Sequence, residues 1–151
     1  MSGVVSYDLY TARFGSSGIG FTSEGGVYET FVNNTGTSVK GTVVVASTTV
    51  YNGVDIAPAK SPFPIGVIYE SGIANGSSVK VVVYGKAQVL LQDTVASYNG
   101  YWCGVSKTVA GRMEQSSSDP AVAEHVREIG HSLQGIAGGT DVLSLVQIHF
   151  N

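Results

Sequence analysis

Short apolar runs separated by turn-forming residues make up most of this chain, and this pattern predicts a β-protein. Three Asn-Gly pairs, at 52–53, 75–76 and 99–100, favour tight reverse turns because both residues tolerate positive φ. Their spacing suits a meander of short antiparallel strands. The strand candidates are rich in β-branched residues and are the segments 39–46, 65–70, 79–91 and 101–109.

Glycine and proline shape two of these regions. Gly85 interrupts the long apolar segment 79–91, so we expect a bulge or a sharp bend there. Pro58, Pro62 and Pro64 predict an extended, non-helical connection, because proline lacks the backbone donor that a helix or a ladder requires.

One helix candidate lies between residues 120 and 133. Asp119 suits an N-cap, Pro120 suits the first helical position, and apolar residues recur at helical spacing from Val122 onward. Gly130 falls inside the segment, however. We therefore expect a short helical turn near 120–125 and a strand over 126–134, with a single longer helix as the alternative. A glycine turn over 137–141 and a strand over 142–150 follow.

The first 38 residues follow a different pattern, in which Gly and Ser alternate with isolated aromatic residues. Two interpretations stay open: a tail with a few residues packed on the core, or an arm whose aromatic rings dock on a neighbouring subunit. We divide the chain into an extended N-terminal arm, 1–38, and a β-domain, 39–151. The predicted fold is all-β, mainly antiparallel short strands in a compact barrel-like or tulip-like domain, with at most one short helix near 120–125.

Composition points to assembly with other proteins. Charged residues make up 13% of the 151 residues, against roughly 25% in an average soluble domain, and a chain so poor in charge often hides much of its surface in an oligomer. The eight basic residues are scattered singly and the net charge is −3, so we expect no nucleic-acid partner. Apolar runs are far shorter than the ~20 residues of a membrane span, so we expect no membrane partner.

Cysteine content and the N-terminal sequence bear on where the protein is made. The single cysteine, Cys103, excludes an internal disulfide framework. The first residues lack the basic and apolar regions of a signal peptide. We therefore expect synthesis in the cytoplasm.

Catalytic motifs are weak in this sequence. The glycine-rich segment 15–20 does not fit the dinucleotide-binding fingerprint. Ser77-x-x-Lys80 matches a pattern of penicillin-recognising enzymes, but it lies in a predicted turn without the companion motifs. We expect no catalytic residue, no cofactor and no enzyme activity.

The histidines offer one alternative to this expectation. If the strands 126–134 and 142–150 pair, His131 and His149 approach one another, and Glu128 or Asp141 would complete a metal site or the site of a small β-barrel enzyme. The ligand spacing of a structural zinc site is absent. We therefore expect structural histidines and no metal ligand.

An aromatic cluster beside the third Asn-Gly turn consists of Tyr98, Tyr101 and Trp102. Such a cluster is typical of a core plug or an interface anchor. It also suits a sugar-stacking platform, which keeps a carbohydrate-binding module open as an alternative.

Several segments from Gly41 onward resemble the small head decoration, or cement, proteins of tailed phages, including the lambda-type decoration proteins. The resemblance lies in a shared sequence of β-runs and glycine turns rather than in an invariant motif. The N-terminal third departs from that pattern. The matching segments are 65–72, 79–89, 128–133 and 142–150.

This resemblance implies a trimer at three-fold or quasi-three-fold sites on the outside of a phage head, where it stabilises the shell. The implied partners are the major capsid protein and further copies of this chain, and the implied location is the virion. We expect Tyr98, Tyr101 and Trp102 to form a secondary interface, and another virion or fibre component remains an alternative role. The residues expected to contact the capsid are Tyr7, Leu9, Tyr10, Phe14 and Phe21.

Overall fold

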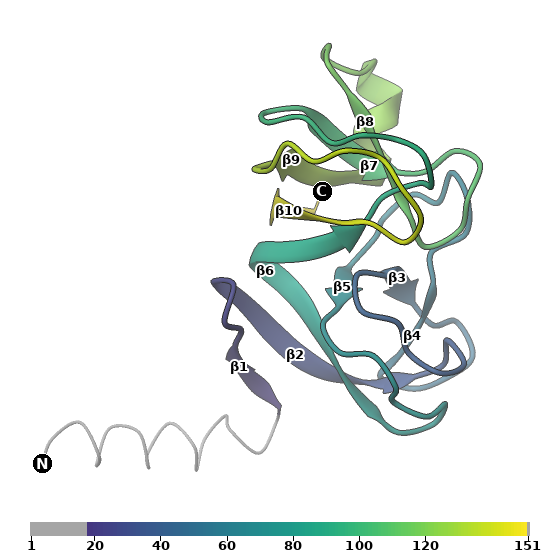
Figure 1. Cartoon of the computed structure of the whole chain (residues 1–151). Helices are drawn as coiled ribbons and strands as arrows, with labels where there is room; N and C mark the ends of the chain where they lie inside the picture. The colour runs from purple at the N-terminus through teal and green to yellow at the C-terminus, as the bar shows by residue number, and fades with distance from the viewer. Residues whose placement is uncertain (1–17, 151) are drawn as a thin grey trace, which may run out of the picture.

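The computed structural model describes residues 18–150, which form ten strands in one hydrogen-bonded sheet (Figure 1). Nearly all pairings are antiparallel; β2 and β4 pair in parallel. The predicted all-β fold is confirmed. The strands are β1 Ile19–Phe21, β2 Gly26–Asn33, β3 Val43–Ala46, β4 Gly53–Ile56, β5 Gly66–Ile68, β6 Ser78–Leu90, β7 Trp102–Val105, β8 Met113–Ser116, β9 Glu128–Ser132 and β10 Leu143–Ile148.

Five strands close into a first ring. Their order is β2–β4–β3–β5–β6, and β6 pairs back onto β2. The β-branched residues predicted to form strands supply its interior, because alternate side chains of each strand point inward. The small core inside the ring consists of Val44, Val54, Ile68, Val79 and Val81.

Strand β6 belongs to both halves of the molecule and crosses its middle in Figure 1. Its residues up to Gly85 pair with β2, whereas those from Gly85 onward pair with β10. Gly85 has a φ of 86°, and a Cβ at this position would lie 2.6 Å from the carbonyl oxygen of Gly25. Only glycine accepts both constraints without strain. The bend predicted at Gly85 is confirmed.

A second ring is built on the C-terminal half of β6 and continues through β10, β9, β7 and β8. A bridge between Leu91 and Met113 returns β8 to the end of β6. The larger core fills this ring and includes Val43, Val67 and Val82 from the first ring. The two rings therefore share a packed apolar interface.

Buried serine hydroxyls in the second ring satisfy one another. Ser144 Oγ donates to Ser97 Oγ at 2.8 Å, and Ser97 and Ser132 lie 2.9 Å apart at their hydroxyls. Gln115 Nε2 also donates to Ser97 Oγ, at 2.7 Å. Because each hydroxyl has a hydrogen-bond partner, the cost of removing these polar groups from water is compensated.

The predicted strands 39–46, 65–70 and 101–109 appear with shorter bounds as β3, β5 and β7, whereas the strand predicted at 79–91 appears at the same length as β6. A 3₁₀ helix at Val122–Arg127 precedes β9, which confirms the short helical turn followed by a strand. The final strand is confirmed as β10. Strands β4 and β8 were not predicted, because their sequences, GVDI and MEQS, lack the continuous β-branched run seen in VVVA of β3.

The N-terminal boundary of the β-domain differs from the expected one. Strand β2 pairs with β6 from Gly26 to Val32, so the described part of the predicted arm, residues 18–38, contributes two strands to the sheet. Residues 1–17 lie outside the described residues, and the arm remains a prediction there. The described part of the chain has no helix with the length and hydropathy of a membrane span.

Candidate functional site

Of the five residues expected to contact a capsid, the structure describes Phe21. It ends β1, an edge strand of the sheet, and its side chain is 79% exposed. Phe21 lies opposite Val27, which lies opposite Tyr84 on β6. Directly opposed residues share one face of a sheet, so these three form an outward-facing row. The others, Tyr7, Leu9, Tyr10 and Phe14, lie outside the described residues.

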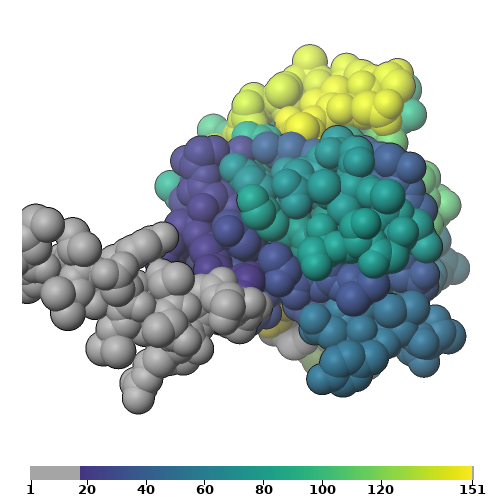
Figure 2. Space-filling view, turned by 90° about the horizontal axis from the view of Figure 1, so that it is seen from below, coloured from purple at the N-terminus to yellow at the C-terminus, as the bar shows by residue number. Residues whose placement is uncertain are grey.

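Strand β1 occupies a flank of the molecule, seen as the purple atoms in Figure 2. The row Phe21–Val27–Tyr84 exposes apolar surface, since Tyr84 is 66% exposed. An edge strand next to exposed aromatic side chains is a typical docking surface for another protein.

The structure separates the aromatic residues predicted as a secondary interface. The rings of Tyr98 and Tyr101 lie 5.0 Å apart, and Tyr98 is half-exposed. Trp102 is buried, with its ring against Gly104, where a Cβ would come within 2.2 Å of the indole. Of the three, only the two tyrosines remain available to a partner. Because Trp102 is buried, its ring cannot stack on a sugar in the carbohydrate-binding alternative.

The structure does bring together three of the residues considered as metal ligands: Glu128, His131 and His149, here called the His–Glu cluster. Their ligand atoms all lie within 4.8 Å of one another. His131 Nδ1 is 3.0 Å from His149 Nε2, which is 3.4 Å from Glu128 Oε1. The two imidazole rings stack, with centroids 5.1 Å apart.

Pairing of the last two strands creates this proximity, as the sequence predicted. His131 lies opposite Gln147 on β10, and the backbone N–H of His149 donates to the carbonyl oxygen of Ile129. The side chains of Glu128 and His131 would point to opposite faces of a regular strand, because they are three residues apart. A register shift against β7 inserts an extra residue into β9 at this point. Such bulges redirect side chains, and here both side chains reach the same site.

Glu128 is almost fully buried, whereas the His149 side chain is 46% exposed. Burial opposes ionisation of the carboxyl, but the hydrogen bond with His125, the Trp102 indole and the nearby histidines outweigh it and lower the Glu128 pKa. The indole N–H of Trp102 has no partner of ordinary hydrogen-bond geometry. It nevertheless lies close enough to Glu128 to favour the ionised form of that side chain. The cluster thus contains a buried, ionised carboxylate below two accessible imidazoles.

Two further residues qualify the sequence prediction. Asp141, the alternative carboxylate, forms an ion pair with Arg112 and is not part of the His–Glu cluster. His125, which the sequence pattern did not place at this site, has its Nδ1 2.6 Å from Glu128 Oε2. It lies at the end of the predicted helical turn, three residues before Glu128 in the predicted strand, and this spacing was the available signal. His125 holds the oxygen of Glu128 that does not face His149.

The reactivity of Cys103 tests directly whether the core of the second ring is buried. Burial raises the pKa of its thiol to about 12, so the reactive thiolate is scarce near neutral pH. We expect the native protein to resist a thiol reagent such as dithionitrobenzoate at about pH 8, and to react fully once guanidinium unfolds it. Rapid reaction of the native protein would contradict the burial of this strand. The rate of colour release measures both cases.

No family model and no curated protein matches the sequence. Among solved structures, the chain is similar to one in the capsid of Myoviridae phage XM1. The likeness covers 82% of this chain and 84% of that chain, with 17% sequence identity and a TM-score of 0.44. Similarity at this level assigns no family, so the proposals below rest on the chain's own residues.

Proposed function

We propose that this protein decorates the outside of a tailed-phage head and stabilises the shell. The observation that carries the proposal is the position of Phe21, 79% exposed at the edge strand β1. Four other large apolar residues, Tyr7, Leu9, Tyr10 and Phe14, precede it within a Gly- and Ser-rich segment. Apolar residues concentrated next to a sheet edge suit docking on another protein.

The rest of the molecule fits a scaffold that presents this edge. The two rings pair most of their strands on both sides, which leaves β1 and β8 as the outer strands of the sheet order. The chain is also poor in charge, with 13% charged residues, and charged residues are depleted in the cores of protein interfaces. The resemblance of the segments from Gly41 onward to phage cement proteins supports the same role.

The proposed mechanism is mechanical rather than catalytic. Each copy, as part of a trimer at a three-fold or quasi-three-fold site, buries apolar side chains across adjacent copies of the major capsid protein. Buried apolar area contributes roughly 25 cal/mol per Å², although the cost of association offsets much of it. Many copies acting together resist separation of the shell, since their weak contacts combine as avidity. The protein would be made in the host cytoplasm and carried on the virion.

The test is co-sedimentation of the purified protein with expanded shells of the phage that encodes it. We expect the wild-type protein to pellet with the shells. A variant with alanine at Tyr7, Leu9, Tyr10, Phe14 and Phe21 should stay in the supernatant while keeping its melting temperature within a few degrees, because Phe21 makes little contact with the core.

The matched control replaces exposed aromatic residues elsewhere. Tyr51 is 96% exposed and Phe63 is 62% exposed, and neither belongs to the row Phe21–Val27–Tyr84 or to the expected secondary interface. The double variant Tyr51→Ala/Phe63→Ala should pellet like the wild type. Binding that survives the five N-terminal substitutions would refute this mode of attachment. Light scattering coupled to size exclusion, applied to the free protein, measures whether the trimer forms before docking.

A further inference from the structure

The His–Glu cluster has the composition and geometry of a transition-metal site. We propose that Glu128, His131 and His149 bind a divalent transition-metal ion such as Zn²⁺, with Nδ1 of His131, Nε2 of His149 and one carboxylate oxygen as ligands. Two histidines and a glutamate with an open fourth position form an established zinc ligand set. This inference is independent of the proposed role on a phage head.

Two of the three distances between the ligand atoms match those around a small ion, and all three atoms lie within 4.8 Å of one another. Ligands at about 2.0–2.2 Å from a tetrahedral zinc lie roughly 3.3 Å from one another. His131 Nδ1 and His149 Nε2 are 3.0 Å apart, and His149 Nε2 is 3.4 Å from Glu128 Oε1. Because both imidazole side chains are exposed, their rotation toward a shared ion would need no change in the core.

The chemical state of the cluster also favours a cation. The Glu128 carboxylate is 5% exposed and brings a negative charge to the floor of the site. His125 contacts Glu128 Oε2, which leaves Oε1 facing His149. A contact of this kind orients a ligating carboxylate and typically strengthens metal binding.

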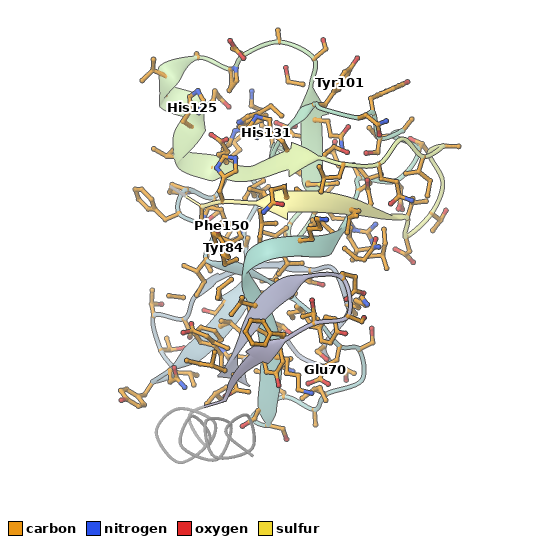
Figure 3. The ribbon with its side chains drawn as sticks, turned by 90° about the vertical axis from the view of Figure 1, so that its left-hand side faces the viewer. Glu70, Tyr84, Tyr101, His125, His131 and Phe150 are labelled. Carbon is orange, nitrogen blue, oxygen red and sulfur yellow. The ribbon has the colours of Figure 1, made fainter. Side chains whose placement is uncertain are left out.

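Access to the cluster comes from the surface. The His149 side chain is 46% exposed and His131 is exposed as well, so an ion can enter without rearrangement of the core. Figure 3, a view of this side of the molecule, labels His125 in the helical turn that precedes β9 and His131 on β9 itself. Because both histidines are exposed, water could occupy a fourth coordination position.

The ion would join two consecutive strands. Glu128 and His131 lie on β9, and His149 directly follows β10. An ion held by all three opposes separation of these strands and stabilises the folded state, because the unfolded chain has no preformed site. Two nitrogen ligands favour Zn²⁺, Ni²⁺ or Co²⁺ over Mg²⁺ and Ca²⁺, which prefer oxygen.

The experiment uses the full chain without a histidine tag, treated with a chelator and then dialysed. We expect Zn²⁺ to bind with a stoichiometry near one per chain in calorimetry and to raise the melting temperature by several degrees. Co²⁺ should give the intense visible absorption of a tetrahedral site, and excess Mg²⁺ should change neither measurement. Absence of saturable Zn²⁺ binding would overturn the proposal.

Variants locate the site. His131→Ala and His149→Ala should each weaken Zn²⁺ binding by about tenfold or more and abolish the Co²⁺ spectrum, without lowering the metal-free melting temperature, because both side chains are exposed. The matched control is Asp141→Asn, which removes a carboxylate paired with Arg112 outside the cluster and should leave the affinity unchanged. Equal binding by the wild type and both histidine variants would place the ion elsewhere and overturn the proposal.

Glu128→Gln adds a test of the carboxylate itself. Because Glu128 is buried, its metal-free unfolding is measured first. If the variant folds, we expect Zn²⁺ binding to weaken by about tenfold or more. Unchanged affinity in a folded Glu128→Gln protein would show that the carboxylate is not a ligand and would overturn the three-ligand assignment.

Discussion

Replacement of Gly130 by alanine should lower the free energy of unfolding by about 3 kcal/mol or more. Gly130 has a φ of 153°, and a Cβ there would lie 1.9 Å from the carbonyl oxygen of Gln147. That oxygen belongs to the backbone of β10, so no side-chain rotation relieves the overlap. The strands must separate locally, which disturbs the pairing that supports the His–Glu cluster.

The matched control is Gly76→Ala. Gly76 also has a positive φ, 88°, but a Cβ there meets nothing within 4 Å. Alanine at this position should cost only the backbone strain, about 1–2 kcal/mol. Urea denaturation followed by circular dichroism compares the two variants. A smaller loss in Gly130→Ala than in Gly76→Ala would contradict the close approach of β9 and β10.

Replacement of Arg127 by methionine should cost about 2 kcal/mol, because a buried guanidinium is lost from two partly exposed carboxylates and a buried carbonyl oxygen. Arg127 is 7% exposed and lies 2.6 Å from Glu114 and 2.5 Å from Glu124. It also donates to the Val105 carbonyl oxygen at 2.5 Å. Its guanidinium lies over the Trp102 ring, 5.0 Å from the ring centre. Methionine keeps much of the packing but leaves these acceptors without their donor.

Arg112→Met provides the comparison on the surface. Arg112 pairs with Asp93 and Asp141, which are 50% and 67% exposed, and exposed ion pairs are worth about 0–1 kcal/mol. Guanidinium denaturation should therefore show a much smaller loss than for Arg127→Met. The Arg127 hydrogen bond is the largest cause of the lowered Glu124 pKa, so NMR titration should find that pKa higher in Arg127→Met. Equal losses in the two variants would contradict the buried network.

Local sequence patterns predicted the strands whose own composition determines their conformation. The apolar density of 79–91 and the glycine within it predicted both the long strand β6 and its bend. Strand β2 escaped prediction because most of its residues, including Tyr28 and Phe31, are only partly buried. Its alternation is therefore indistinct, and pairing with β6, rather than its own composition, determines its conformation.

The candidate site, too, could be predicted only in part. The approach of His131 and His149 followed from pairing the last two strands, a relation visible in the sequence. Glu128, rather than Asp141, lies beside the two histidines because of the bulge in β9. No residue pattern in the sequence predicts this bulge. Burial of Trp102 depends on the space above Gly104, which only the assembled sheet defines.

The shared strand β6 also sets an order for folding during synthesis. The strands of the first ring, β2 to β6, are consecutive in the chain. All of them have therefore been translated before β7 to β10, which complete the second ring. The second ring must wait for β10, the last described strand, which inserts between β6 and β9. Until then the C-terminal half of β6 presents an open edge, and such edges invite pairing with other chains. A nascent or truncated chain that lacks β10 is therefore the form of this protein most exposed to aggregation.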